Sequence, residues 1–492
     1  IVGSLSPLGG MQPYSLTQLS GAHLSLPSLM LNQHPLANEQ DAEDYVARLI
    51  AMETALKGVA ETYQAEVNKG LIPPRFSLES IIESLKLVRA ESAEKHTLVK
   101  HFKEAIAQID GLDNDRQADL VRAASQAVEK NVYPAYQFLQ GRIENTLPLA
   151  SNTPGLNARP NGELLYAMIL EHYGAAGKSA DEIHALGLRE VARIHAEMDD
   201  ILRAEGYREG EVMTRFLKVT LEPRFTYPNT EEGKQQILDT LNKLMADADV
   251  RMPDFVNTLP KAPVIAKRIP AHEEDSSADG YYTGPSLDGT RPGIYWINLK
   301  DTADWSSLEL PALTYHEASP GHHLQSTIAQ EVKNMPMVRN FIWHSPYGEG
   351  WALYVEKVAK ELGMFDADPY GDLGRLQSEL FRAARLVVDT GLHHKGWSRE
   401  RAVKYMHEIS GESMGTAARE VDRYAVWPGQ ACSYKLGQLE ILALRDDVRA
   451  TLGEHFSLQA FHDQILLPGS VPLAVLRNNI ETWAAQEKAA TQ

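Results

Sequence analysis

Apolar residues spaced three and four positions apart run through most of this chain, and they constrain its fold more than any other feature. Segments 41–66, 76–109 and 114–130 show this spacing, which is typical of amphipathic helices. Ser179 and Glu182 have the capping-box spacing that begins a further long helix. Similar patterns resume after residue 311 and continue to residue 452. The sequence therefore predicts a mainly α-helical protein.

Strand signals are confined to the middle of the chain. Residues 262–270 and 293–299 are rich in β-branched and aromatic side chains and are bounded by Gly or Pro, whereas 271–292 has the composition of a loop. Residues 293–298 are expected to form an edge strand that pairs with a substrate backbone, with Tyr295 contacting the substrate.

A stretch rich in Pro, Gly and Asn at 147–162 is expected to be a linker or a long loop. The predicted organisation is an N-terminal helical region, residues 1–150, followed by a helical catalytic region, residues 151–492. The second region contains the small sheet, within residues 262–299. One continuous domain is the alternative.

Composition excludes several classes of protein. The chain has 492 residues, and its 48 basic and 66 acidic side chains give a net charge of −18, which argues against nucleic acid or an anionic membrane as the main partner. No apolar run approaches the roughly 18 residues of a transmembrane helix. Cys432 is the only cysteine, so an internal disulfide and a cysteine-based zinc site are both excluded. The chain starts at Ile1, so a leader upstream of residue 1 is an open expectation.

The segment TYHEASPGHHLQ, residues 314–325, carries the strongest chemical signal. Zinc peptidases of the H-E-x-x-H type place two histidines four residues apart on one helical face. Here His322 follows His316 by six residues, which on a regular helix puts it about 9 Å further along and roughly 120° around the axis. Pro320 cannot donate to the His316 carbonyl, and Gly321 has a permissive backbone, so two residues are expected to bulge out.

That bulge would bring His322 within reach of an ion bound by His316. The alternative is that the helix ends at Ser319 and that the histidines after it are solvent-exposed or core residues. His323 is the alternative ligand, but using it requires three extra residues in the bulge. If His322 binds the ion, His323 is expected to face the substrate or a carboxylate that supports the ligands. Glu317, directly after His316, is expected to act as the general base.

Glu349 is the expected third ligand of a single zinc ion. It follows His322 by 27 residues at the start of a predicted helix and lies between two glycines. Glu356 is the alternative, but we expect it to be a solvent-exposed side chain. The set His316, His322 and Glu349 leaves one position for water.

The segment DRYAVWPGQACSYKLG, residues 422–437, gathers Arg423, Tyr424, Gln430 and Tyr434 around a Pro-Gly turn. A phenol or a cation there would stabilise an oxyanion or hold a substrate carboxylate. For each of these residues a packed aromatic core is the alternative.

Two weaker candidates remain. His394 would contact the substrate, unless it simply interacts with a helix C-terminus through the helix dipole. Ser413, in GESMG, matches the nucleophile elbow of serine hydrolases, but the segment before it is helical and charged, so a helix break is expected.

The segments TYHEASPGHHLQ, GEGWALYVE and RYAVWPGQACSYKLG, following DGTRPGIYWIN, together resemble the bacterial domain-of-unknown-function family DUF885 over about residues 30–485. That family is grouped with gluzincin-like metallopeptidases, whose relatives include thimet oligopeptidase, angiotensin-converting enzyme (ACE) and dipeptidyl peptidase III. The resemblance implies a large helical gluzincin-like (thimet oligopeptidase/ACE-like) fold with a small β-sheet before the metal-site helix. It also favours His322 as the second ligand and Tyr434 as the transition-state tyrosine. It further implies export to the periplasm or cell envelope, with an optional lipid anchor upstream of residue 1; a cytoplasmic location is the alternative.

The resulting prediction is a zinc metallopeptidase that cleaves short peptides. The alternatives are a zinc hydrolase of a non-peptide amide or ester, a hydrolase dependent on Ser413, and a non-catalytic binding protein on the same fold. Glu317 beside His316 argues against the last of these, since a binding protein needs no base there.

Overall fold

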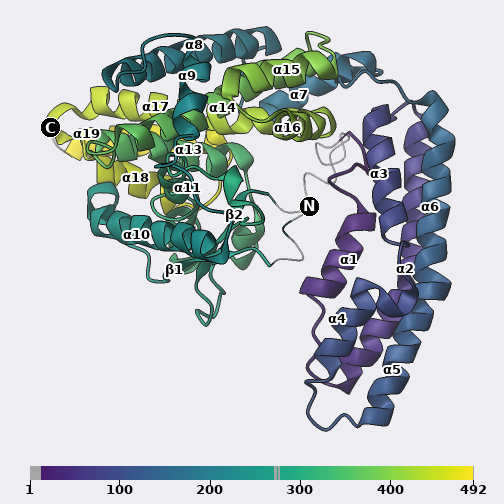
Figure 1. Ribbon diagram of the computed structural model, residues 1–492. Helices are drawn as coiled ribbons and strands as arrows, with labels where there is room; N and C mark the ends of the chain where they lie inside the picture. The colour runs from purple at the N-terminus through teal and green to yellow at the C-terminus, as the bar shows by residue number, and fades with distance from the viewer. Residues whose placement is uncertain (1–12, 271–273, 275–277, 491–492) are drawn as a thin grey trace. The chain divides into compact units, whose positions relative to one another are not determined.

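The computed structural model describes residues 13–270, 274 and 278–490 (Figure 1). Its internal contacts divide the chain into two compact units. The N-terminal unit runs to Tyr166 and also includes Leu392–Glu400 and Ala418–Pro428. The larger unit comprises Ala167–Gly391, Arg401–Ala417 and the chain from Gly429 onward.

The N-terminal unit is a bundle of helices around one apolar core, and α2 packs against both α5 and α6 (Figure 1). The segment 76–109 is not one continuous helix: His96 caps a new helix by accepting the Leu98 N–H. The α-helices that lie entirely before Tyr166 are α1 (Ala22–Asn32), α2 (Glu39–Asn68), α3 (Arg75–Leu87), α4 (Thr97–Ile106), α5 (Asn114–Ala127) and α6 (Tyr133–Thr146).

Helices also dominate the rest of the chain. The predicted capping box is confirmed, because the Ser179 hydroxyl accepts the Glu182 N–H and the Glu182 carboxylate accepts the Ser179 N–H. Most of α16 belongs to the N-terminal unit. The helices are α7 (Gly162–His172), α8 (Ala180–Ala204), α9 (Val212–Thr220), α10 (Glu231–Phe255), α11 (Leu310–Glu317), α12 (His322–Glu331), α13 (Ser345–Glu361), α14 (Pro369–His393), α15 (Arg399–Ser410), α16 (Met414–Val426), α17 (Ser433–Leu452), α18 (Leu458–Leu466) and α19 (Leu473–Ala490).

A small sheet precedes α11, as expected for the segment 262–299. It contains β1 (Val264–Arg268), β2 (Gly280–Thr283) and β3 (Gly293–Ile297) in the order β1-β3-β2. Strand β3 pairs in parallel with β1 and antiparallel with β2. The expectation that β3 is an edge strand is therefore wrong, because both of its edges are already paired. The segment 271–292, where a loop is predicted, contains β2.

Two core clusters in the larger unit support the region around the histidine motif. Side chains of α10, including Ile237 and Leu241, pack against Tyr295 and Ile297 of the sheet. A second cluster joins α13 to α17, α18 and α19. No helix within the described residues is both long enough and apolar enough to cross a membrane.

Candidate metal centre

The helical backbone breaks completely between α11 and α12. Residues 318–321 leave the helical conformation, and the Ser319–Pro320 peptide is cis. At position 321 a Cβ would lie 1.8 Å from the His316 carbonyl oxygen, so only glycine fits this close approach. The two extra residues are thus accommodated by a break rather than by a bulge in one continuous helix. His316 ends in the last turn of α11, and His322 is the first residue of α12.

The break brings the two imidazole rings together, with centroids 4.9 Å apart and planes nearly perpendicular. Helix α13 adds the Glu349 carboxylate, whose Oε2 lies 3.6 Å from His316 Nε2 and 3.4 Å from His322 Nε2. The three potential ligand atoms all lie within 4.8 Å of one another. Zinc bonds of 2.0–2.1 Å in tetrahedral geometry require ligand atoms about 3.3 Å apart. The spacing to Glu349 therefore suits an ion of this size.

The electrostatics of this triad also suit a cation. Burial raises the pKa of Glu349, but hydrogen bonding and charge from His316 and His322 outweigh it and leave that pKa well below its usual range. Burial lowers the pKa of His316, yet the Glu349 and Glu356 carboxylates raise it to about 9. The same carboxylates that favour a proton on His316 would favour a cation at this position, so proton and metal binding would compete.

Glu356 lies behind His316 and is buried. Its Oε1 is 2.7 Å from His316 Nδ1, so a hydrogen bond there orients the ring and leaves Nε2 directed towards Glu349. The expectation of a solvent-exposed Glu356 is wrong. The sequence did contain a signal, because Glu349 and Glu356 are seven residues apart and thus lie on one face of α13. Carboxylates that orient a ligating histidine in this way are a regular feature of metal sites.

His323 points to different partners. Its Nδ1 lies 2.9 Å from the Tyr282 hydroxyl, and its Nε2 lies 3.0 Å from the Ala262 carbonyl oxygen. Burial lowers its pKa to about 4, so the ring is neutral. Both ring nitrogens are engaged outside the triad. Tyr282 belongs to β2, a strand with no local sequence signal, so this contact is not predictable from the sequence.

Glu317 is the last residue of α11 and is buried directly after His316. The pKa of Tyr295 is raised well above its usual value, first by burial and then by the negative charge of Glu317. Tyr295 itself is fully buried in the central strand. The expectation that Tyr295 contacts the substrate depends on an exposed edge of β3. Because both edges of β3 are paired, the structure does not support that expectation.

Tyr434 and Gln430 lie near the beginning of α13. The Ser433 and Ser345 hydroxyls are 2.7 Å apart, and Gln430 Nε2 lies 3.3 Å from the Ser345 hydroxyl. Ser345 precedes Glu349 by four residues, one helical turn. The half-buried Tyr434 ring is covered by the Arg385 guanidinium at 4.5 Å. Both residues thus belong to the same part of the unit as the triad.

Helices α13 and α17 run parallel and touch through glycines. A Cβ on Gly437 would lie 2.0 Å from the Pro346 carbonyl oxygen and 2.8 Å from the Gly350 Cα. Further along both helices, the Gln438 amide donates to the Leu353 carbonyl at 3.1 Å. This contact fixes the helix that carries Glu349 against the helix that carries Tyr434.

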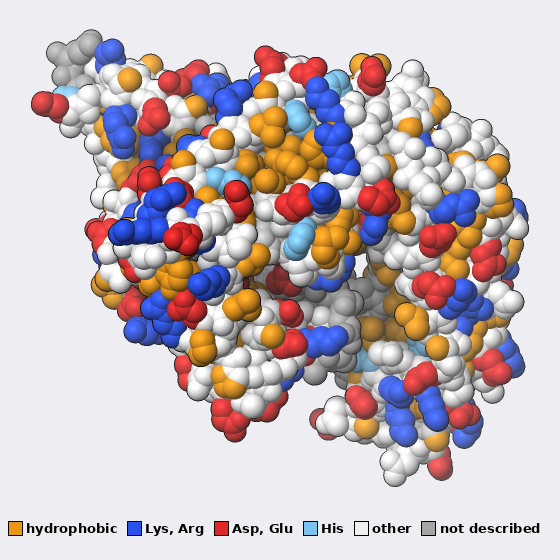
Figure 2. Space-filling view, turned by 45° about the horizontal axis from the view of Figure 1, so that its top comes forward, with side chains coloured by type: hydrophobic (Ala, Val, Ile, Leu, Met, Phe, Trp, Pro, Cys, Tyr) orange, Lys and Arg blue, Asp and Glu red, His pale blue; other side chains and the backbone are white. Residues whose placement is uncertain are grey.

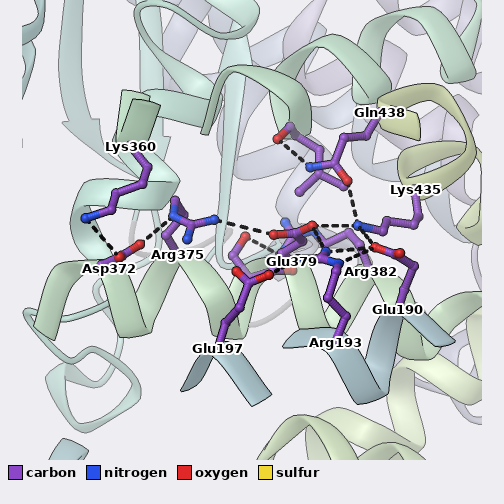
Figure 3. A network of polar contacts seen from close by, with 12 residues as sticks. Glu190, Arg193, Glu197, Lys360, Asp372, Arg375, Glu379, Arg382, Lys435 and Gln438 are labelled. Carbon is purple, nitrogen blue, oxygen red and sulfur yellow. Dashed lines mark hydrogen bonds and ion pairs between the residues drawn. The ribbon is translucent and has the colours of Figure 1, made fainter. Parts of the chain in front are cut away.

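A buried network of charges holds the start of α17 in place (Figure 3). Lys435 is completely buried and pairs with Glu379 of α14 at 2.6 Å and with Glu190 of α8 at 2.9 Å. Glu379 also pairs with Arg193 and Arg375. Burial raises the pKa of Glu379, but these three cations hold it well below its usual range. The network compensates each buried charge and connects α8, α14 and α17.

Three expected site residues lie in the other unit. Arg423 and Tyr424 both contact Glu420, the arginine by an ion pair at 3.0 Å and the tyrosine hydroxyl by donating a hydrogen bond at 2.6 Å. His394 directly follows α14 in the N-terminal unit. The structure does not place these residues in the same compact unit as the triad.

Ser413 begins a helix. Its hydroxyl accepts the Thr416 N–H at 3.1 Å, which is an N-cap interaction, and the residue is exposed. Helix α15 precedes it, whereas a nucleophile elbow follows a strand. The strand–turn–helix geometry of a nucleophile elbow is therefore absent at Ser413.

Acidic and basic side chains are interspersed over the face of the molecule drawn in Figure 2. No broad basic area of the kind that tracks a nucleic-acid backbone is visible on that face.

Comparison with known proteins extends this description. The chain is similar to a "putative lipoprotein" from Colwellia psychrerythraea, with 40% identity and a TM-score of 0.93 over 97% of this chain and 82% of that one. A "putative lipoprotein of unknown function" from Shewanella oneidensis has the same fold, with 18% identity and a TM-score of 0.72 over 97% and 84% of the two chains. No curated protein matches.

These neighbours agree with the expected location, exported or in the cell envelope. Residues 4–480 match the family model described as "Bacterial protein of unknown function (DUF885)". The match covers nearly the whole chain and includes every candidate residue discussed above, so this protein belongs to the DUF885 family.

Proposed function

We propose that this chain is a zinc-dependent metallopeptidase of the gluzincin type that cleaves short peptides with the help of an activated water molecule. One observation carries the proposal: Nε2 of His316, Nε2 of His322 and Oε2 of Glu349 converge from three helices. The gluzincin-like character of the helical fold is part of the same proposal.

The donor set fits zinc, because two neutral imidazoles and one carboxylate are typical of catalytic zinc sites. A zinc ion held by His316, His322 and Glu349 would supply Lewis acidity and lower the pKa of a water molecule. Glu317, which directly follows His316 in the chain, would serve as the general base that holds a proton and returns it to the leaving amine.

Other residues support the reaction by orientation and charge. Glu356 keeps the proton of His316 on Nδ1, so that Nε2 presents its lone pair to the ion. Tyr434 is proposed to donate a hydrogen bond to the oxyanion, while Gln430 contacts the substrate. The neighbours described as "putative lipoprotein" favour an envelope setting, and a lipid anchor belongs to this proposal.

The proposal is tested by digesting a peptide library and identifying the products by mass spectrometry, with zinc and with a chelator. We expect cleavage that the chelator abolishes and added zinc restores. Cleavage that persists in the chelated protein would reject the metal mechanism. If only non-peptide amides or esters are cleaved, the substrate class is wrong.

Glu317→Gln tests the role of the base. This variant should retain its zinc but lose hydrolysis by about 10²–10⁴-fold, because the proton acceptor is removed. Glu232→Gln, an exposed site in the first turn of α10, is the matched control and should behave as wild type. Loss of zinc in Glu317→Gln would instead identify Glu317 as a ligand.

A further inference from the structure

A short apolar stretch, Met337–Trp343, lies on the surface just before α13. Phe341 is 74% exposed and Met337 69% exposed, and Val338, Ile342 and Trp343 are exposed as well. Apolar side chains gathered in this way on a soluble protein generally mark a binding surface. None of these side chains belongs to the triad or to the buried core.

The stretch is continuous with the candidate metal centre. The Trp343 ring meets the His322 ring edge to face, with centroids 5.7 Å apart. A Cβ on Gly348 would lie 2.1 Å from the Trp343 ring, so the ring rests on the backbone directly before Glu349. Trp343 nevertheless remains 51% exposed. The apolar surface therefore begins at two of the three proposed ligands and extends outward from them.

The conformation of the stretch is held from within the protein. Arg339 donates from Nη2 to the carbonyl oxygens of Pro468 and Ser470, at 2.7 and 3.2 Å. At the end of the stretch, the His344 N–H donates to the Ser470 hydroxyl at 2.9 Å. A surface fixed in this way loses little conformational entropy when a ligand binds to it.

We propose that Met337–Trp343 forms a subsite for a bulky apolar side chain of the substrate, next to the bond that is cleaved. This inference rests on the proposed peptidase function and names its substrate class: peptides with a large hydrophobic residue flanking the scissile bond. A membrane is the less suitable partner for the stretch. Its one basic side chain, Arg339, is engaged by backbone carbonyls, and the net charge of the chain is −18.

The test compares quenched fluorescent peptides of equal length that differ only by Phe or Ser at one position, scanned over the positions around the cleaved bond. The zinc-loaded protein should favour Phe over Ser at one flanking position by about tenfold or more in kcat/KM. In the double variant Met337→Ser/Phe341→Ser this ratio should fall close to one. Leu221→Ser, at an unrelated site of 76% exposure, is the matched control and should keep the ratio.

Two binding measurements separate failure of the subsite from failure of the peptidase function. Short peptide hydroxamates that carry Phe or Ser are titrated by calorimetry into the zinc-loaded protein and the double variant. One outcome is that no peptide is cleaved, while the wild-type protein prefers the Phe hydroxamate over the Ser hydroxamate and the double variant does not. That result would support the subsite and reject the peptidase function. Cleavage with no Phe preference, or with one that the double variant keeps, would overturn the subsite alone.

Co-sedimentation with phosphatidylcholine vesicles tests the membrane directly. We expect the wild-type protein and the double variant to behave alike. Vesicle binding that the double variant loses, with an unchanged Phe-to-Ser ratio, would make Met337–Trp343 a membrane contact and overturn the proposal.

Discussion

At the scale of single residues, the neighbouring His322 and His323 have opposite environments. His322 Nε2 faces the Glu349 carboxylate, whereas both nitrogens of His323 are engaged by Tyr282 and by the Ala262 carbonyl. A histidine whose two nitrogens are already bonded cannot ligate an ion without breaking one of those bonds.

We therefore expect His322→Ala to be poor in zinc after dialysis, while His323→Ala retains its ion. Zinc content is measured by atomic emission on the dialysed proteins. His455→Ala, at an exposed histidine, is the control for nonspecific binding. The reverse pattern would transfer the ligand role to His323, and full retention in both variants would remove the motif from the metal site.

The hydrogen bond from His316 to Glu356 predicts a second effect. Glu356→Gln keeps a hydrogen-bond acceptor but removes the charge that makes His316 a better ligand. Zinc affinity should fall by about 10–100-fold, as measured by competition with a chromophoric chelator. An unchanged affinity would show that Glu356 contributes to packing only.

At the scale of elements, the parallel contact of α13 and α17 depends on Gly437. In Gly437→Ala, the new Cβ would meet the Pro346 carbonyl at 2.0 Å, and neither backbone can move without disturbing the helix that carries Glu349. Overpacking of this kind costs about 1–3 kcal/mol. We expect a lower Tm in circular dichroism melts, together with weaker zinc binding.

Gly58→Ala provides the comparison for this prediction. Gly58 lies within α2, and nothing would approach its Cβ within 4 Å. Alanine there should stabilise the helix by about 0.5–1 kcal/mol. If both glycine variants raise the Tm, the space between α13 and α17 at position 437 must be large enough for a Cβ, and the close contact between the two helices is wrong.

The elements also show which parts of the fold can be predicted from sequence. Helices α2 and α8 and strands β1 and β3 appear where periodicity and capping place them, because local preference and tertiary packing agree there. Strand β2 has only four residues and is defined by its pairing with β3, which no local pattern reveals. Similarly, the break after α11 is held by a distant residue, since the Trp351 indole donates to the Pro320 carbonyl.

In the candidate site, too, some residues can be identified from local sequence and others only from tertiary packing. His316, His322, Glu317 and Glu349 could be named because zinc peptidase chemistry dictates residue types and spacing. The burial of Glu356 and the partners of His323 depend on which helix faces pack together. Spacing alone therefore could not assign their roles.

At the scale of the whole molecule, each unit contains a buried neutral histidine. Burial lowers the pKa of His23, in the N-terminal unit, to about 4, and that of His462, in the larger unit, to about 3. In the unfolded chain both titrate near 6.5. The unfolded state therefore binds more protons between these values, so both units should lose stability as the pH falls below about 6.5.

His462 allows this prediction to be tested in one unit. Its Nδ1 lies 2.7 Å from the Phe255 carbonyl, its Nε2 lies 2.8 Å from the Tyr354 hydroxyl, and its ring centroid is 5.2 Å from that of Trp351. Tryptophan fluorescence should thus report unfolding around it. Between about pH 6 and pH 4, His462→Gln should reduce the dependence of unfolding free energy on pH by about 1.4 kcal/mol per unit, although it lowers stability at neutral pH. Denaturant titrations at several pH values measure both slopes, and equal slopes would mean that His462 already carries its proton in the folded protein.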